Sequence, residues 1–427
     1  MLRFLQSQQK VRLVSARVLP CRAIELNFSK TPGLNYNPMS SIFVNVPKIS
    51  KLQWHPFTIT SSSNLEPEKL SVVIKSEGNW SQKLYEELSL PSITHLQVSV
   101  EGPYGPATTH FHKYEKLVMF SGGSGITPFI SIIRELVHMA NDPDTTIRTP
   151  QILLIPAFKK SLDLGILDLL LPVSGINHDI SRLRLKIQAY VTQESAPPRT
   201  ATENQHYRTI WFKPSALDAP ISALLGRNTW LWLGMIIVWF SVISLTSIAV
   251  VTRLYIYPID HNTNMIYSYT VRSLLNMLII CMSIAITVII AFLWNKKGNS
   301  TEMRQIGVTD GPTPMTSPGT SSWYYNADRE LESLPNNFFA GCIKVNCGER
   351  ADFKKILTEI EGSNVGVLVS GPKKMRQDVA AICSSGFSRK LQFESISFSC
   401  SPLSMKKKRR TSHTSTIDFG RCIVYHR

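Results

Sequence analysis

Cysteine is scarce in this 427-residue chain, and its seven cysteines are scattered, odd in number and without the spacing of a disulfide framework. This pattern argues against a disulfide-stapled secreted domain and indicates reduced thiols in the cytosol. Cys342 and Cys347 form one C-x4-C pair. No second pair of ligands accompanies them, so ordinary strand-end cysteines are favoured over a metal site. The sequence also lacks D-x-D-x-D-G calcium loops, which disfavours regulation through EF-hand calcium binding.

Acidic residues are few as well: 30 Asp and Glu stand against 46 Lys and Arg, and the formal net charge is +16. The chain lacks zinc-finger spacing, an RNP motif and a basic helix interleaved with aromatics, which disfavours nucleic acid as a partner. A membrane surface or an anionic cofactor explains the excess charge more economically. The N-terminus lacks the features of a secretory signal, and Met1 opens directly into sequence typical of the middle of a protein.

Two long uncharged runs stand out from the rest of the sequence: Trp230–Val251 and Leu274–Trp294, of 22 and 21 residues. Each is close to the roughly 20 residues that span the hydrocarbon core of a bilayer, so they predict two transmembrane helices. Basic residues favour the outer flanks over the connecting loop by five to two: Lys213, Arg227, Lys296, Lys297 and Arg304 against Arg253 and Arg272. We therefore expect both flanks in the cytosol. Because two spans return the chain to the side it left, the flanks can belong to one soluble domain.

A glycine-rich turn follows a short apolar run at Leu117–Phe129, LVMFSGGSGITPF. The turn consists of Gly122, Gly123, Gly125, Ile126, Thr127 and Pro128. Glycines at the end of a strand let backbone N–H groups approach a pyrophosphate, and the following helix N-terminus adds positive potential. The spacing differs from the dinucleotide fingerprint, so by itself the turn predicts a nucleotide site and a plain tight turn about equally.

Short strand-like segments separated by Pro, Gly and Asn occupy residues 11–46 and predict a small antiparallel barrel. The next strand carries His55, Pro56, Phe57 and Thr58. An aromatic ring beside a hydroxyl can pack on a flavin and bond its polar edge. On these four residues alone, an ordinary barrel strand is the favoured interpretation.

A lysine and a helix start come next, because Lys75 ends a strand, Gly78 follows, and Trp80 and Ser81 open a helical pattern. A lysine before a helix N-terminus can hold the pyrophosphate of a second dinucleotide. Another strand then ends in the tight turn Gly102–Gly105.

Two lysines, Lys159 and Lys160, end the strand that follows the glycine-rich turn and its helix. Lysines at this position can pair with the 2′-phosphate of a nucleotide. The sequence agrees equally well with two solvent-exposed lysines that have no role in binding. Beyond the second apolar run, residues 297–322 predict a flexible linker. A strand then ends at Gly371 and Pro372, and Met375 lies on an apolar helix stripe more typical of core than of cofactor contact.

Taken in order, HPFT, the strand of Lys75 with GNWS, EGPYG, SGGSGITPF and VSGPKKM resemble the flavin and pyridine-nucleotide half of the ferric reductase family. The resemblance covers residues 3–399 and is to the plant ferric-chelate reductases in particular, relatives of the NADPH oxidases and ferredoxin reductases. It implies an α+β multidomain membrane protein of ferredoxin-reductase-like fold. An antiparallel β-barrel FAD domain and an α/β parallel-sheet NADPH domain would be interrupted by a two-helix transmembrane hairpin.

The resemblance also implies a role for each motif. FAD would be bound by His55, Pro56, Phe57, Thr58, Lys75, Gly78, Trp80 and Ser81. NADPH would be bound by Gly122, Gly123, Gly125, Ile126, Thr127, Pro128, Gly371 and Pro372, with Lys159 and Lys160 at its 2′-phosphate. No side chain is expected to act as acid or base, because hydride passes between the two cofactors. The choice between NADPH and NADH stays open.

The expected domains follow from these motifs. They are a FAD barrel (1–112), the first part of the NADPH domain (113–192), a linker (193–229), the hairpin (230–294, with spans 230–251 and 274–294), a flexible linker (295–336), the second part of the NADPH domain (337–399) and a basic disordered tail (400–427). The plasma membrane, with both cofactor domains cytosolic, is the expected location, and an organellar membrane is the alternative.

Two departures from the family pattern qualify the expected activity. Neither span contains a histidine, so this chain holds no ligands for the haem b groups of full-length relatives. Cys400 stands where the family closes on an aromatic residue near the flavin. We therefore expect a dehydrogenase half that passes electrons from NADPH through FAD toward ferric chelates. The alternatives are an NADPH oxidase-like module that reduces oxygen, and a catalytically silent truncated form that associates with a full-length haem-containing reductase.

Overall fold

The computed structural model describes residues 10–31, 33–90, 93–106, 111–142, 149–170, 183–194, 208–213, 215, 218–222, 229–257, 259, 268–308, 343–360, 362–385 and 391–396. The chain divides into two compact units. One consists of Met1–Gln9, Lys30–Asn35 and Pro220–Ser321, and the other of Lys10–Ser29, Tyr36–Ala219 and Ser322–Arg427. Every named strand belongs to the second unit, which we call the reductase unit, and we call the first the hairpin unit.

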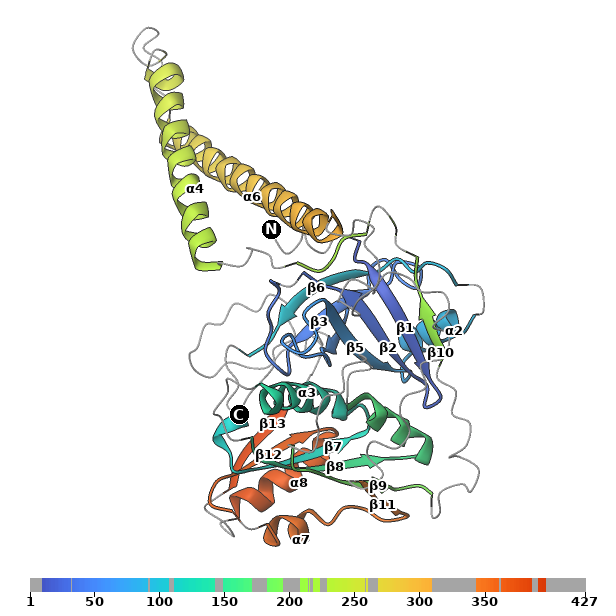
Figure 1. The fold of residues 1–427 in the computed structure, drawn as a ribbon. Coiled ribbons are helices and arrows are strands. Elements are labelled where there is room, and N and C mark those ends of the chain that lie inside the picture. Colours follow the sequence, from blue (N-terminus) through green and yellow to red (C-terminus); the bar gives the residue numbers. More distant parts are fainter. Residues whose placement is uncertain are drawn as a thin grey trace. The chain divides into compact units, whose positions relative to one another are not determined.

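The N-terminal part of the reductase unit is built from two antiparallel sheets (Figure 1). The four-stranded sheet has the order β10 (Arg208–Trp211), β1 (Leu13–Leu19), β2 (Ala23–Ser29), β5 (Lys69–Lys75). The three-stranded sheet has the order β4 (His55–Thr58), β3 (Ser41–Asn45), β6 (Ser99–Tyr104). A bridge between Ile59 and Val72 connects the two sheets at the edge that β4 and β5 share. Helix α2 (Asn79–Ser89) follows β5 and buries Trp80, Leu84 and Leu88.

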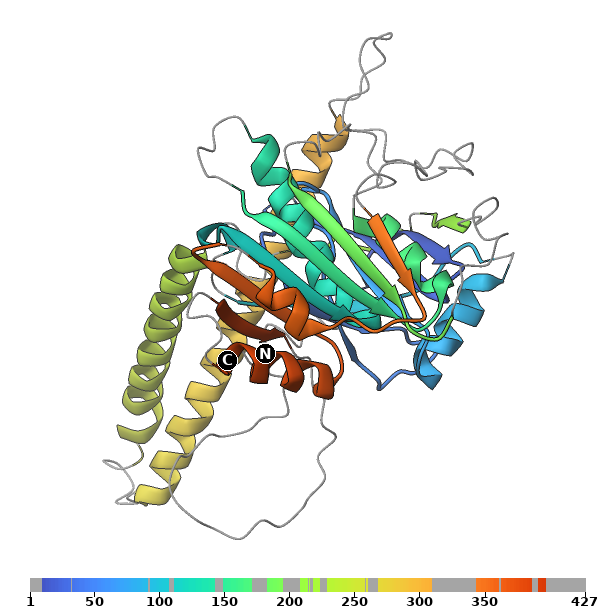
Figure 2. The same ribbon diagram turned by 90° about the horizontal axis from the view of Figure 1, so that it is seen from below.

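A six-stranded parallel sheet forms the rest of the reductase unit (Figure 2). Its order is β11 (Ile343–Cys347), β9 (Leu185–Val191), β8 (Gln151–Phe158), β7 (Lys116–Gly122), β12 (Val365–Ser370), β13 (Leu391–Ile396). Strands β7 to β9 precede the hairpin in sequence and β11 to β13 follow it, yet β12 pairs with β7 and β11 with β9. The expectation that both flanks of the hairpin fold into one domain is therefore confirmed, and so is the predicted fold class of barrel plus parallel sheet.

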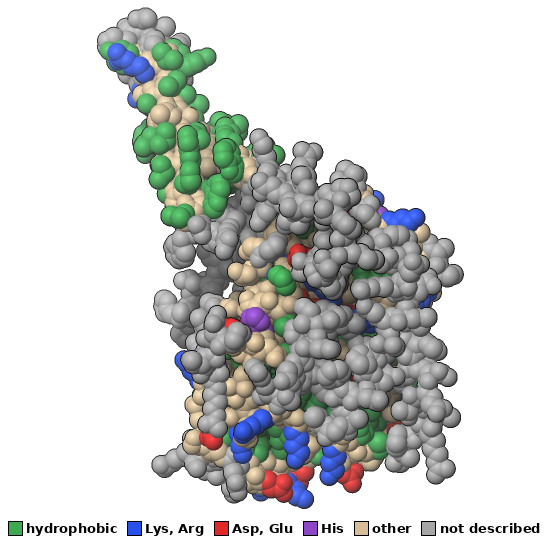
Figure 3. Space-filling model, viewed as in Figure 1, with side chains coloured by type: hydrophobic (Ala, Val, Ile, Leu, Met, Phe, Trp, Pro, Cys, Tyr) green, Lys and Arg blue, Asp and Glu red, His purple; other side chains and the backbone are tan. Residues whose placement is uncertain are grey.

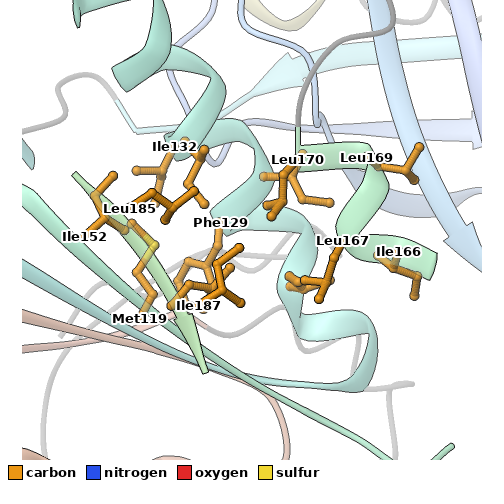
Figure 4. Close-up of a cluster of buried hydrophobic side chains, with 14 of the residues drawn as sticks. Met119, Phe129, Ile132, Ile152, Ile166, Leu167, Leu169, Leu170, Leu185 and Ile187 are labelled. Carbon is orange, nitrogen blue, oxygen red and sulfur yellow. The ribbon is translucent and has the colours of Figure 1, made fainter. Parts of the chain in front are cut away.

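Helices cover both faces of the parallel sheet because its strands carry apolar residues on both sides, as buried parallel strands do. Helix α3 (Thr127–Asn141) and the 3-10 segment η3 (Ser161–Leu170) pack on one face. In Figure 4, Phe129 and Ile132 of α3 meet Met119, Ile152, Leu185 and Ile187 of the sheet. Helices α7 (Phe353–Thr358) and α8 (Lys373–Ser384) pack on the other face, over Val118 and Phe120.

A buried charge network joins α3 to the barrel strands. Arg134 of α3 is 1% exposed, and its Nη1 donates to Glu66 Oε2 at 3.1 Å. Its Nη2 donates to the carbonyl oxygen of Leu169 at 2.7 Å and lies 3.7 Å from Glu25 Oε1. Arg17 pairs with Glu25 at 3.3 Å. Buried charges are stable only when paired in this way, so the network fixes the barrel against α3.

The hairpin unit contains helix α4 (Thr229–Val251), the π-helical turn η5 (Thr252–Ile256) and helix α6 (Tyr269–Val308). Two stretches, Leu231–Ile256 and Tyr269–Trp294, are long and apolar enough to cross a membrane. Figure 3 shows hydrophobic side chains over these helices, and Leu231, Leu245 and Leu274 are each at least 66% exposed. The hydroxyls of Ser283 and Thr287 are buried and donate to carbonyls four residues earlier, which satisfies them without water.

Two expected linkers contain regular structure. Strand β10 lies within the expected linker 193–229 and pairs with β1, so this segment contributes a strand to the barrel sheet. Helix α6 runs to Val308, so the expected flexible linker 295–336 begins as a helix. In both places the local composition favours a linker. Pairing with β1 nevertheless makes β10 a strand, and α6 extends beyond its apolar part because adding a residue to an existing helix is easier than starting a new one. The tail 400–427 lies outside the described residues.

Candidate functional site

A cleft of about 720 Å³ opens in the reductase unit where barrel strands β4 and β5 face the carboxyl ends of the parallel strands. Ligands of open parallel sheets bind outside the carboxyl ends of the strands, so this is the expected place for a nucleotide. Twelve of the residues that the sequence selects line it: Pro56, Phe57, Thr58, Lys75, Gly122, Gly123, Gly125, Thr127, Pro128, Lys159, Gly371 and Pro372. The cleft therefore gathers the HPFT strand, the glycine turn and the Gly371-Pro372 turn.

The sheet side of the cleft is made by two turns in close contact. A Cβ atom on Gly125 would lie 2.5 Å from the carbonyl oxygen of Ser370, and one on Gly122 would lie 2.7 Å from Pro372 Cδ. Gly123 has a φ of +58° with open space around its missing side chain. Gly122 and Gly125 are thus needed for packing of the two turns, whereas Gly123 leaves backbone exposed toward the cleft.

Helix α3 begins at this turn, after the 3-10 segment η2 (Gly123–Ile126). Pro128 lies in its first turn, where no N–H is needed, and no acidic residue is present there. The unpaired N–H groups of the first turn and the helix dipole give this end a positive potential. An anionic phosphate is the kind of group that the turn can hold.

The barrel side of the cleft is aromatic. The rings of His55 and Trp80 have centroids 4.5 Å apart, and Phe57 stacks on Trp80 at 5.9 Å with an interplanar angle of 28°. Burial lowers the pKa of His55, so its imidazole is neutral at pH 7. His55 Nε2 and Trp80 Nε1 are buried, and neither has a hydrogen-bond partner among the described residues. Phe57 lines the cleft and offers its ring to a planar ligand such as a flavin, whereas His55 and Trp80 do not line it.

Three cations reach the cleft: Lys75, Lys159 and Arg376. Lys75 Nζ lies 3.0 Å from Asp163 Oδ1, so Lys75 forms an ion pair with a residue of η3. Arg376 Nη1 donates to Ser395 Oγ at 3.5 Å, and its Nε has no hydrogen-bond partner among the described residues. Glu77 is the one acidic residue among the described lining residues. The lining residues therefore carry a net positive charge, which favours the negatively charged phosphates of a dinucleotide.

Six of the selected residues lie outside the lining. Ile126 is fully buried in the core under α3. Ser81 and Gly78 form the start of α2: Ser81 Oγ accepts from the Gly78 N–H at 3.0 Å and donates to the Gly78 carbonyl. The Trp80 ring contacts the rings of both His55 and Phe57, and Lys160 is exposed beside Lys159.

Other lining residues were not selected as ligands from the sequence: Ser124, Phe158, Thr192, Met375, Arg376 and Ile396 are among them. Met375, expected on a core stripe, lines the cleft, and its Sδ would lie 3.3 Å from a Cβ on Gly122. The signal available in the sequence was its place one turn after Gly371-Pro372. Thr192 and Arg376 reach the cleft because β9 ends and α8 begins there. No group of three or more His, Cys, Asp or Glu side chains in the described ranges is placed to hold a metal ion.

The fold and the cleft together define a two-domain flavin- and pyridine-nucleotide-binding module. The family comparisons agree: residues 8–108 match the FAD-binding domain model and residues 114–384 match the ferric reductase NAD binding domain model. The second match covers more than half of the chain, and the chain belongs to the ferric reductase family.

The chain is also similar to individual proteins and solved structures. The chain is 53% identical to ferric reduction oxidase 2 of Arabidopsis thaliana over 401 residues, which are 93% of this chain and 55% of that protein. It is 35% identical to NADPH oxidase 1 of Mus musculus over 151 residues, 35% of this chain and 25% of that one. A ferredoxin NADP+ reductase from Neisseria gonorrhoeae with bound FAD and NADP superposes with a TM-score of 0.34 at 15% identity, covering 44% and 70% of the two chains. The chain spans about half the length of the ferric reduction oxidases it matches.

Proposed function

We propose that this chain is the dehydrogenase half of a membrane-bound ferric-chelate reductase, an FAD-dependent enzyme that oxidises NADPH and delivers electrons toward ferric chelates. One observation carries the proposal: a single cleft brings together Phe57 and Thr58 of the barrel and a glycine turn at a helix N-terminus. The family membership and the 53% identity to a ferric reduction oxidase support this reading over other flavin enzymes.

The residues of the chain bind and orient, and none is needed as acid or base. When bound, FAD would supply the redox chemistry, taking a hydride from the nicotinamide and releasing electrons singly. Phe57 and Thr58 would hold the ring system from the barrel side, with His55 next to them on the same strand, and Lys75 would bind its phosphates. The turn at Gly122 to Pro128 would hold the pyrophosphate of NADPH, and Gly371 with Pro372 would lie near the nicotinamide. Bringing the two rings together and excluding water is the contribution of the protein.

The hairpin anchors this half to a membrane. Leu231–Ile256 and Tyr269–Trp294 have the length and composition of membrane spans, and their two crossings leave β9 and β11 free to join one sheet. We place the reductase unit in the cytosol at the plasma membrane, because the basic residues flank the outer ends of the spans. Electrons reach ferric chelates through a haem-containing partner or the remainder of a longer chain.

The test is purification in detergent with FAD supplied. Flavin absorbance retained through gel filtration, together with NADPH-dependent reduction of ferricyanide, is the expected result. Absence of both would instead favour the silent form that associates with a full-length reductase. After reconstitution with a haem-containing reductase, ferric-chelate reduction is expected, and superoxide release without it would favour the oxidase alternative.

A further inference from the structure

The carboxyl ends of β8 and β9 form the part of the cleft edge where the sequence places Lys159 and Lys160. The two strand ends are joined by backbone hydrogen bonds: the Thr192 N–H donates to the Phe158 carbonyl at 2.9 Å, and the Gln193 N–H donates to the Lys159 carbonyl at 3.1 Å. Phe158, Lys159 and Thr192 line the cleft. The residues that follow on both strands are therefore held at the rim of the site.

Glu194 is the acidic residue at this rim. Its Oε2 accepts the backbone N–H of Ser161 at 2.9 Å. Hydrogen bonds from the Ser161 hydroxyl and backbone lower the pKa of the Glu194 carboxyl, and nearby Lys160 acts in the same direction. Glu194 is thus a fixed negative charge at neutral pH, and it occupies a hydroxyl and an N–H that a 2′-phosphate would otherwise use.

A carboxylate and a pair of lysines favour opposite coenzymes. In nucleotide-binding sheets a carboxylate at the end of a parallel strand can accept the ribose 2′-hydroxyl of NADH, whereas cations accommodate the 2′-phosphate of NADPH. Here the two lysines follow the second strand of the sheet, β8, and Glu194 follows the neighbouring third strand, β9. This rim presents both groups. We propose that Glu194 is a specificity-determining residue that opposes the 2′-phosphate, so that the chain accepts NADH as well as NADPH. The inference rests on the proposed function, because it requires the cleft to bind a nicotinamide dinucleotide.

The test compares binding of NADP+ and NAD+ to the purified full chain by quenching of tryptophan fluorescence, without any turnover. Glu194→Gln keeps an oxygen for the Ser161 N–H and removes the charge. We expect it to raise the affinity for NADP+ relative to NAD+ by about fivefold, the size typical of a partly exposed charge. Glu194→Asp keeps the charge and should leave the ratio near that of the parent chain.

Salt separates an electrostatic role from a structural one. At high ionic strength exposed charges are screened, so the difference between the parent chain and Glu194→Gln should fall below about twofold. Glu359→Gln is the matched control, because Glu359 is an exposed carboxylate at the end of α7. It should change neither affinity.

The other possible results contradict either the inference about Glu194 alone or the proposed function as well. If both dinucleotides bind and Glu194→Gln leaves their ratio unchanged, the inference is wrong and the proposed function stands. If a parent chain that retains flavin binds neither dinucleotide, the proposed function and the inference fail together. A parent chain that binds NADP+ at least a hundredfold more tightly than NAD+ would also overturn the inference.

Discussion

The sheet side of the cleft presents glycine where the barrel side presents aromatic rings. Gly122 and Gly125 allow two turns to touch because their side chains are missing, whereas Phe57, Trp80 and His55 form a stacked group because theirs are large. At Gly122 and Gly125 the first wall therefore has no space for an added Cβ atom, whereas the second wall loses contacts when a ring is removed. Substitutions on the two walls should therefore weaken ligand binding for opposite reasons. A larger residue in place of glycine causes a steric clash, and a smaller residue in place of an aromatic ring removes contacts.

The largest loss of stability is expected at the buried charge network of Arg134, which connects α3 to the barrel. Arg134→Met removes a buried cation from Glu66 and Glu25, whose remaining ion-pair partners among the described residues are Lys69 and Arg17. Breaking a buried ion pair in this way should destabilise the reductase unit by about 3 kcal/mol. The measurement is the midpoint of denaturant unfolding, followed by tryptophan fluorescence. Arg350→Met, at an exposed arginine, is the control, and equal midpoints for the two variants would show that the network contributes nothing.

The next effect concerns the sheet wall. Gly125→Ala places a Cβ 2.5 Å from the carbonyl oxygen of Ser370, so the backbone must shift, at a cost of about 2–3 kcal/mol. Gly123→Ala has open space and should lose about 1 kcal/mol through its positive φ alone. Thermal unfolding of both variants checks the order. A Gly125→Ala variant as stable as Gly123→Ala would mean that the two turns are not in the contact described.

The barrel wall is tested by Thr58→Ala, which should lower flavin affinity about fivefold because one hydrogen bond, worth about 1 kcal/mol, is lost. Flavin content after gel filtration is the measurement. Thr60→Ala is a close control: Thr60 is equally buried and donates to the Ser71 carbonyl, but it does not line the cleft. Equal flavin content in parent and Thr58→Ala chains would remove Thr58 from the site.

Much of the fold could be predicted from sequence because its signals are local. The apolar strands at β7, β8 and β12, the glycine turn and the two uncharged runs each stand out within about 25 residues. Strand β10 could not, because its four residues form a strand only through pairing with β1, about 190 residues away. The even number of spans predicted that both flanks could share a domain, and the pairing of β7 with β12 confirms it.

The site was harder to predict because side-chain partners depend on strand order. Lys75 reads as a free cation in sequence, yet Asp163 lies 3.0 Å away on a different domain. Ser81 is predicted to hold a phosphate, and in the structure its hydroxyl hydrogen-bonds to the backbone of Gly78 at the start of its own helix. Arg376 and Thr192 have no motif, and they reach the cleft only because parallel strands end at the same edge. The motifs thus predicted which turns line the cleft better than they predicted the partners of its charged side chains.

The smallest effect is expected at the rim, where the sheet wall ends in charges instead of glycines. Lys159→Ala combined with Lys160→Ala should weaken NADP+ binding about threefold and leave NAD+ binding nearly unchanged, because exposed cations act weakly on a phosphate. Lys159 lines the cleft and Lys160 does not, so Lys159→Ala alone should give most of the change. Lys354→Ala with Lys355→Ala on α7 is the control, since it removes the same charge from the opposite face of the sheet. An unaltered ratio of the two affinities would remove both lysines from the site. A change larger in Lys160→Ala than in Lys159→Ala would move the 2′-phosphate outward toward Glu194, because Lys160 is the lysine that interacts with that carboxylate.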